Sequence, residues 1–111
     1  MAKKAKMPAG EILGLAGLVS YSKASVVSRT LVENRAGTVT LFAFDAGQGL
    51  SEHTAPFDAL VQVIDGYGRF TVGGRGYAVK TGQVLLMPAG VPHAVQAVRR
   101  FKMLLTMLRS K

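Results

Sequence analysis

The sequence predicts an all-β fold, because short runs of β-branched and aromatic residues recur along most of its 111 residues and are separated by glycine. Only residues 11–19 are expected to form a helical turn or two, since no longer amphipathic periodicity is present. Short strands at regular intervals with glycine turns are typical of a β-sandwich or barrel. Strands are expected at residues 25–32, 38–45, 59–64, 69–72, 77–79, 83–87, 94–98 and 101–108.

The dipeptide Gly73-Gly74 predicts a tight hairpin. It separates the strand-like residues 70–72 from residues 77–79. The primed turns of hairpins need positive φ angles, which glycine adopts without a Cβ clash. We therefore expect the two flanking strands to pair with each other.

Two of the expected strands, at residues 38–45 and 101–108, are apolar on both faces. A strand with one face in water normally alternates apolar and polar residues. We therefore expect both faces of these strands to be covered, one of them by a second subunit. The sequence thus predicts a homodimer.

Composition limits both the size of the fold and its chemistry. The length suits one hydrophobic core, and 49% hydrophobic against 18% charged residues is not the composition of a disordered chain. The chain has no cysteine, which excludes disulfides, iron–sulfur clusters and thiolate zinc sites and fits a reducing compartment. Any metal must therefore be held by nitrogen or oxygen ligands.

The net charge of +8 comes largely from basic residues near the two ends, whereas four of the six acidic residues fall in the central segment. Clustered positive charge attracts nucleic acids, but no helix-turn-helix, RNA-binding or zinc-finger pattern accompanies it. We therefore expect no nucleic-acid partner. The basic residues near the ends are Lys3, Lys4, Lys6, Arg99, Arg100, Lys102, Arg109 and Lys111.

The first residues do not predict export or membrane insertion. Residues 12–19 form a short apolar stretch after several lysines, but the stretch contains two glycines and no small-residue cleavage site follows it. No apolar run approaches the ~20 residues that a membrane-spanning helix needs. We expect a soluble, cytoplasmic protein without a membrane partner.

The strongest motif is GQVLLMPAGVPH, which ends at His93. Its Gly82, Pro88, Gly90 and His93 have the spacing G-x5-P-x-G-x2-H and resemble the second motif of the cupin family, G-x5-P-x-G-x2-H-x3-N. The glycine is expected to lead into a buried strand and the Pro-Ala-Gly turn to end it, so that the histidine points inward. Ala97 stands where the family usually has asparagine.

A second stretch resembles the first cupin motif, G-x5-HxH-x3,4-E-x6-G. Gly47 is followed six residues later by His53, and Gly66 closes the segment. Ala55 stands at the second histidine position and Ala59 at the glutamate position. The resemblance implies a cupin-type double-stranded β-helix, or jelly-roll, barrel.

The resemblance covers residues 26–108 and therefore sets the expected domain organisation. Residues 1–111 are interpreted as a single cupin domain, in which a short N-terminal lead-in at residues 1–20 precedes the barrel. Strand alternation then predicts which residues of the two motif segments point inward and share one pocket. They are His53, Ala55, Ala59, Val61 and Val63 on one segment, and His93, Val95 and Ala97 on the other.

In cupins the motif histidines and glutamate bind iron, manganese, nickel or zinc, and the resemblance implies that His53 and His93 are metal ligands here. Two neutral imidazoles leave the charge of a divalent metal uncompensated, so a third ligand must come from elsewhere. Strand alternation puts Gln62 and Gln96 out of phase with the inward positions. The nearby candidates are Glu52, Asp58, Gln62 and Gln96, and no organic cofactor is expected.

Three functions remain open from the sequence. The first is a binding module that holds a small organic or anionic ligand with His53, His93 and, at the pocket mouth, Glu52. The second is a metal-dependent cupin oxygenase or isomerase, in which the two histidines hold a divalent metal. The third is a structural dimeric domain. Cupins host binding and catalysis on one fold, and the two alanines favour the binding module.

Overall fold

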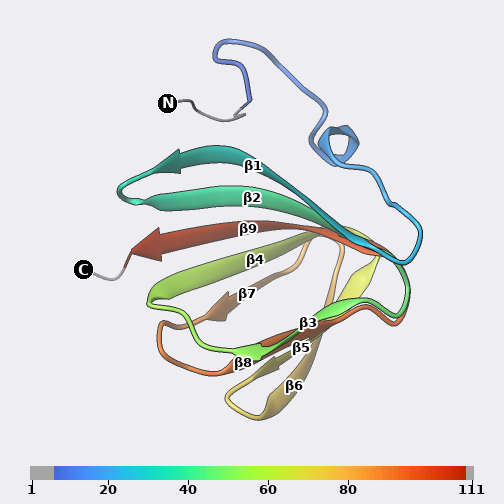
Figure 1. Cartoon of the computed structure of the whole chain (residues 1–111), viewed down its shortest axis with the longest axis vertical. Coiled ribbons are helices and arrows are strands. Elements are labelled where there is room, and N and C mark those ends of the chain that lie inside the picture. The colour runs from blue at the N-terminus through green and yellow to red at the C-terminus, as the bar shows by residue number, and fades with distance from the viewer. Residues whose placement is uncertain (1–6, 110–111) are drawn as a thin grey trace.

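The computed structural model describes residues 7–109 and shows an all-β jelly roll in which two antiparallel sheets face each other (Figure 1). The basic residues Lys3, Lys4, Lys6 and Lys111 lie outside this range. Within it, a short 3₁₀ helix precedes nine strands. The elements are η1 (Leu15–Leu18), β1 (Val26–Asn34), β2 (Gly37–Phe44), β3 (Gly49–His53), β4 (Phe57–Asp65), β5 (Tyr67–Val72), β6 (Arg75–Lys80), β7 (Val84–Met87), β8 (His93–Gln96) and β9 (Phe101–Arg109).

The order of strands in the sheets is not their order in the chain. Among the described residues, the larger sheet has the order β1-β2-β9-β4-β7 and the smaller sheet the order β3-β8-β5-β6. Figure 1 shows the larger sheet fanned out above the smaller one, with the chain crossing repeatedly between them. These crossings put β3 beside β8, although about 40 residues separate the two strands along the chain.

The strands expected from the sequence are all present, with ends that agree within two residues. Strand β3 was not expected. Its residues Gly49, Ser51, Glu52 and His53 are neither β-branched nor apolar, and all four are exposed. It is a strand because it pairs with β8, so its own composition gives little signal.

The predicted hairpin at Gly73-Gly74 is confirmed. The two glycines have φ angles of 58° and 82°, and the flanking strands β5 and β6 pair along their whole length. The expected helical turn is also present, as η1.

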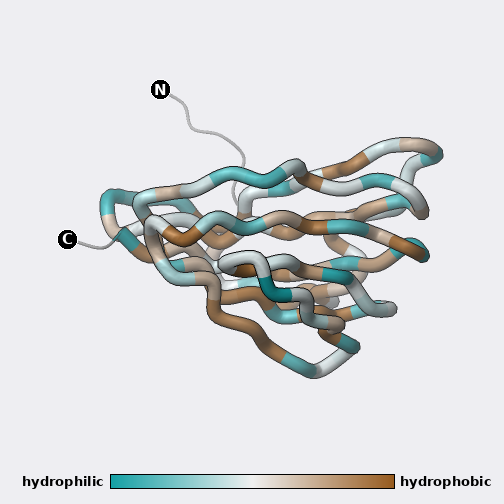
Figure 2. The backbone as a smooth tube through the Cα atoms, turned by 90° about the horizontal axis from the view of Figure 1, so that it is seen from below, coloured by the Kyte–Doolittle hydropathy of each residue, from teal (hydrophilic) through white to brown (hydrophobic). Residues whose placement is uncertain are grey.

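The core lies between the two sheets and is built from inward residues at alternate strand positions, with aromatic rings at one end. The rings of Phe44 and Phe101 stack with centroids 4.8 Å apart, and Phe70 meets Phe101 edge-on at 6.0 Å. All three are at most 1% exposed. Figure 2 shows hydrophobic stretches recurring along the backbone and alternating with hydrophilic ones.

The outer face of the larger sheet is partly covered by the N-terminal segment of the same chain. Leu41 and Ala43 of β2 point away from the core, yet each has an exposed fraction of 0%. They are packed against Leu18, Val19 and Tyr21. The apolar outer face of β2 is therefore covered without a second subunit, and this strand no longer supports the expectation of a homodimer.

The packing around Gly68 generates a stability prediction. A Cβ built at Gly68 would lie 2.5 Å from Cζ of Phe101, whose ring is held by its stacking neighbours. We expect Gly68→Ala to lower the free energy of unfolding by about 1–3 kcal/mol, because the overpacked core cannot relax freely. Urea denaturation measures this change.

Gly76→Ala is the matched control, since Gly76 lies on the neighbouring strand with nothing within 4 Å of its Cβ position. Its effect is expected to stay within about 0.5 kcal/mol. Equal destabilisation by the two substitutions would contradict the proposed contact with Phe101.

Candidate ligand site at the histidine pair

The two histidines of the chain meet on neighbouring strands of the smaller sheet. His53 ends β3, His93 begins β8, and the two are directly opposite partners in the β3–β8 ladder. Their ring centroids are 4.5 Å apart with an interplanar angle of 69°, an edge-to-face contact. The structure thus brings together the residues that strand alternation placed in one pocket.

The alternation predicted for the two motif segments is largely present. The inward residues of β4 and β8 are buried, whereas Gln62 and Gln96 are exposed on the opposite faces, out of phase as expected. Ala55, in the loop after β3, is half-buried, and His53, the last residue of β3, is exposed. The buried members are Ala59, Val61, Val63, His93, Val95 and Ala97.

The two rings differ in exposure and therefore in their place in the site. His93 is 5% exposed, so it forms part of the wall. His53 is open to solvent and lies at the rim.

A β-bulge orients His53. Leu50 pairs with Val95 and His53 with His93, so β3 has one more residue than β8 over this stretch. Nδ1 of His53 lies 2.7 Å from the carbonyl oxygen of Ser51. A bulge next to a functional site commonly re-aims a side chain in this way.

His93 has a matching arrangement, with its Nδ1 3.1 Å from the carbonyl oxygen of Val91. A carbonyl oxygen only accepts hydrogen bonds, so Nδ1 of each histidine must carry the hydrogen and donate it. In the neutral ring Nε2 is then an unprotonated acceptor. Among residues 7–109, no hydrogen bond is found to Nε2 of His53 or His93.

Two further hydrogen bonds fix the loop that leads into His93. The amide of Gly90 donates to the carbonyl oxygen of Ala55 at 2.9 Å, and the amide of Ala89 donates to Oδ1 of Asp58 at 2.9 Å. The β7–β8 loop is thereby tied to the segment that follows His53. Both histidines therefore belong to one connected end of the barrel.

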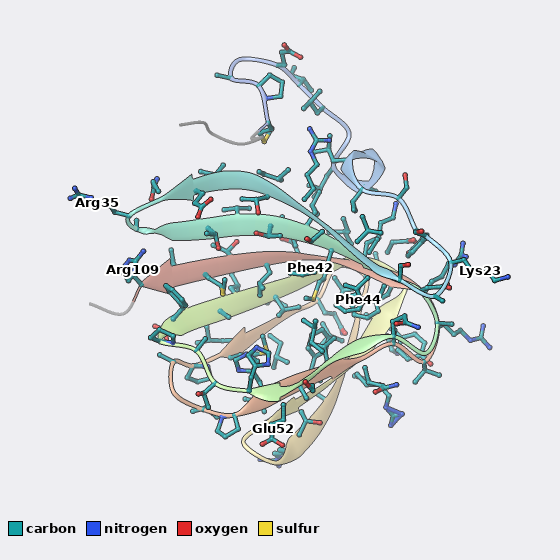
Figure 3. The ribbon with its side chains drawn as sticks, in the orientation of Figure 1. Lys23, Arg35, Phe42, Phe44, Glu52 and Arg109 are labelled. Atoms are coloured by element: carbon teal, nitrogen blue, oxygen red, sulfur yellow. The ribbon has the colours of Figure 1, made fainter. Side chains whose placement is uncertain are left out.

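The structure does not bring a third metal ligand to the pair. Within residues 7–109, no three His, Cys, Asp or Glu side chains are close enough together to hold an ion. Figure 3 shows the exposed Glu52 on the side of the smaller sheet that faces away from the larger sheet. An oxygen of Asp58 is already engaged by an amide, and Gln62 and Gln96 point outward. The two alanines Ala55 and Ala59 occupy the remaining motif positions.

Sequence reasoning missed one polar group at this end of the barrel, the hydroxyl of Thr38. Thr38 lies opposite Met107, and Met107 lies opposite Ala59, so all three side chains point inward in one row of the larger sheet. The Oγ1 atom is buried and has no hydrogen-bond partner among the described residues. A buried hydroxyl without a partner is uncommon in native proteins. The sequence could have indicated this group only through the inward strand position of Thr38, because a threonine in a strand is ordinary.

A hollow of about 290 Å³ lies beside the bulge, on the outer side of the smaller sheet. Arg69 and Thr71 contribute to its wall, and neither histidine does. This hollow is therefore separate from the histidine site. Its lining is completed by Leu50, Ser51, Ala94, Val95 and Gln96.

Two facing antiparallel sheets, with the motif histidines meeting at one end, define a cupin-type barrel. Residues 35–108 match the family described as the AraC-like ligand binding domain. The chain belongs to this family. No curated protein gives a significant match to the chain.

Solved structures support the same assignment. A conserved protein of unknown function from Streptococcus pyogenes is 34% identical with a TM-score of 0.91, over 100% of this chain and 97% of that one. A cupin superfamily protein from Desulfitobacterium hafniense is 28% identical with a TM-score of 0.88, over 98% and 100%. A cupin 2 conserved barrel domain protein from Leptotrichia buccalis is 40% identical with a TM-score of 0.85, over 87% of this chain and 47% of its own length. This chain thus spans about half of the Leptotrichia protein.

The hydrogen bonds of the two rings generate a spectroscopic prediction. In the neutral form both His53 and His93 are expected to carry the hydrogen on Nδ1, because each Nδ1 faces a backbone carbonyl oxygen. Long-range ¹H–¹⁵N correlation spectra distinguish the two tautomers of each ring. Finding the hydrogen on Nε2 of either ring would contradict the orientation described here.

Proposed function

We propose that the protein binds a small organic molecule at the histidine end of the barrel, with His53 and His93 as polar anchors. The observation that carries this proposal is the contact of the two rings at 4.5 Å, with each Nδ1 held by a backbone carbonyl oxygen. Such rings offer two Nε2 atoms of fixed direction to a bound molecule.

The chemistry of the site favours a ligand that carries a hydroxyl or an acidic group. A neutral imidazole accepts a hydrogen bond at Nε2, and a protonated one attracts a carboxylate. The inward neighbours are small or apolar, as with Ala59 and its cross-strand partner Met87. Small-molecule sites typically combine such an apolar lining with a few polar groups that fix orientation.

Thr38 is proposed as a further anchor on the opposite wall. Its buried hydroxyl has no partner among the described residues, and leaving such a group unpaired costs about 1–3 kcal/mol. A ligand or water that reaches it would recover this cost. The hydroxyl thus supports an occupant that extends from the histidines toward β2.

The alternative is a metal-dependent cupin enzyme, an oxygenase or isomerase, in which His53 and His93 hold iron, manganese, nickel or zinc. The free Nε2 atoms favour it, because metal-binding histidines commonly donate their other ring hydrogen to a carbonyl or carboxylate. The incomplete ligand set opposes it, since catalytic zinc sites usually have three protein ligands. The binding function therefore stands first.

We further propose a cytoplasmic location. A chain without cysteine suits a reducing compartment. Among residues 7–109, no helix has the length and apolar character that crossing a membrane requires.

The ligand proposal predicts that untagged protein purified without added metal carries a bound organic molecule in native mass spectrometry. His53→Ala and His93→Ala are expected to reduce its occupancy or affinity about tenfold or more, because each removes a polar anchor worth roughly 1–3 kcal/mol. Gln96→Ala is the control, since Gln96 lies on the same strand as His93 but points outward.

Elemental analysis of the same preparation separates the two functions. Stoichiometric iron, manganese, nickel or zinc that is lost in both histidine variants would overturn the metal-free binding proposal and support the enzyme. Unchanged ligand occupancy in the histidine variants would show that His53 and His93 do not form the ligand site.

The role of Thr38 gives a prediction in which stability and binding move in opposite directions. Thr38→Val removes the unpaired hydroxyl while keeping the shape, so the unliganded protein is expected to be as stable as wild type or up to about 1 kcal/mol more stable. Ligand affinity is expected to fall about tenfold. Thermal unfolding and titration with the recovered ligand measure the two effects, and equal affinity would contradict the anchor.

A further inference from the structure

We propose that β6, the edge strand of the smaller sheet, is a docking site for an extended acidic peptide segment of another protein. The segment adds as a further strand beside β6 and points an acidic side chain toward Arg69 on β5. This inference is independent of the proposed ligand, because neither β6 nor the hollow beside it contains a histidine.

The main chain of β6 offers unpaired groups along its outer edge. In the smaller sheet β6 is bonded to β5 alone and stands at the end of the strand order. A two-residue hairpin turn is closed by a hydrogen-bonded pair, here Val72 and Arg75, so the main-chain groups of Gly76 and Ala78 face away from β5. The amide of Lys80, which has the same direction, donates to Oε1 of Gln83 at 2.9 Å. Among residues 7–109, the amides of Gly76 and Ala78 have no such partner.

Edge strand β6 lacks the irregularities of the other edge strands. Its ladder with β5 runs from Arg75 to Lys80 without a shift of register. At the opposite edge of the same sheet, β3 has a bulge after Leu50, and in the larger sheet β1 has an irregularity after Thr30 while β7 has only four residues. Bulges and short length protect edges against added strands. Within the described chain, β6 is therefore the regular edge.

A hollow of about 340 Å³ lies next to this edge, over the outer face of β5 and β6. Arg69 is the cross-strand partner of Ala78, and Thr71 is that of Gly76. These four residues line the hollow, and Phe70 and Tyr77 complete it. Because Gly76 and Ala78 have almost no side chain, a side chain from a strand beside β6 can pass over them and reach β5.

Arg69 supplies the charge that such a side chain would meet. It is exposed, and its guanidinium has no hydrogen bond or ion pair among residues 7–109. Neighbouring strands lie about 4.8 Å apart, so a residue added opposite Ala78 stands roughly 10 Å from Arg69 at the main chain. A glutamate and an arginine together span this separation, and a guanidinium binds a carboxylate through two parallel hydrogen bonds. The hydroxyl of Thr71 is a further donor beside it.

The charge of the smaller sheet selects an acidic partner. Its four strands contain three basic residues, Arg69, Arg75 and Lys80, and one acidic residue, Glu52, which lies on β3 at the opposite edge. A second copy of this chain has a net charge of +8 and is repelled at a basic edge. An acidic segment is attracted there, which is why we assign the edge to another protein and not to a second copy.

Tyr77 defines the other face of the docked segment. It is the cross-strand partner of Phe70 and is 39% exposed, so its ring offers apolar surface on the side opposite to the hollow. Successive side chains of an added strand point to opposite faces. The partner segment is therefore expected to alternate acidic residues, which face Arg69, with apolar residues, which face Tyr77.

The experiment uses two fluorescein-labelled peptides, VEVEVEV and VKVKVKV. Fluorescence anisotropy is expected to show saturable binding of VEVEVEV to the wild-type protein and at least tenfold weaker binding of VKVKVKV. Arg69→Gln is expected to weaken VEVEVEV binding about tenfold, because the carboxylate loses its guanidinium partner. Arg75→Gln is the matched control, since it removes the same charge from the same hairpin but Arg75 does not line the hollow.

Ala78→Pro tests the main-chain pairing. The amide of Ala78 faces away from β5, so proline removes a donor to the added strand while the hydrogen bonds between β5 and β6 remain. Binding of VEVEVEV is expected to fall tenfold or more, with the fold checked by circular dichroism. Gly76→Val is a second variant that fills the hollow, because nothing lies within 4 Å of a Cβ at Gly76. It is expected to weaken binding of the same peptide.

The outcomes separate strand addition from other uses of this edge. Loss of VEVEVEV binding in Arg69→Gln and in Ala78→Pro or Gly76→Val, with binding retained in Arg75→Gln, supports the proposal. Equal affinity for the two peptides, or wild-type affinity in both Ala78→Pro and Gly76→Val, would overturn it. Displacement of the labelled peptide by an equal concentration of free glutamate would instead show a small-anion site. Self-association of the wild type that Ala78→Pro abolishes would show that a second copy occupies the edge.

Discussion

The register between β3 and β8 is the constraint on which the candidate site depends. It makes His53 and His93 direct partners, and the bulge after Leu50 lets His53 face its partner while its Nδ1 remains bonded to the carbonyl oxygen of Ser51. Because side chains alternate along a strand, a slip of one residue would turn a histidine to the other face. The backbone therefore positions the rings before any ligand is involved.

The histidine end of the barrel has two of the ligand residues of a cupin metal site and lacks the other two. The histidines stand at two of the cupin motif positions, but Ala55 and Ala59 provide no donor at the two other positions where a cupin metal site would have one, and no metal-binding group is found among residues 7–109. The unpaired hydroxyl of Thr38 is instead suited to a molecule that brings its own polar atoms. The fold is that of a cupin, but its set of metal-ligand residues is incomplete. For this reason we propose ligand binding ahead of metal-dependent catalysis.

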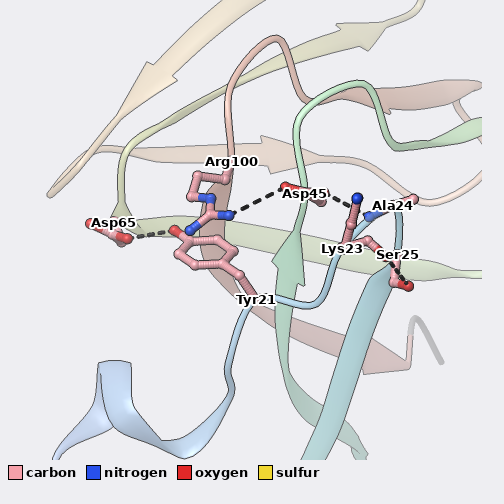
Figure 4. A network of polar contacts seen from close by, with 7 residues as sticks. All are labelled: Tyr21, Lys23, Ala24, Ser25, Asp45, Asp65 and Arg100. Carbon is pink, nitrogen blue, oxygen red and sulfur yellow. Dashed lines mark hydrogen bonds and ion pairs between the residues drawn. The ribbon is translucent and has the colours of Figure 1, made fainter.

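The N-terminal segment, residues 7–22 and here called the strap, lies over part of the outer face of the larger sheet. The larger sheet has an apolar outer face that water would contact if the barrel stood alone, and the strap covers the part around Leu41 and Ala43. The strap is fastened by polar contacts at Tyr21 (Figure 4) and at Lys102, yet it joins β1 through a strained turn at Ala24.

The sequence by itself determined most of the barrel. Strand periodicity, the Gly73-Gly74 hairpin and the spacing of the two motifs are local properties, and they located eight of the nine strands within residues 7–109 and the inward parity of His93. It could not reveal β3, because Gly49, Ser51 and Glu52 have no strand preference and are ordered only by pairing with β8. It also could not show what covers the outer face of β2, since an apolar strand looks the same beneath a strap as beneath a second subunit. The ring orientations and the unpaired Thr38 hydroxyl were decided by tertiary structure, because each depends on atoms brought together from distant parts of the chain or on the bulge between paired strands.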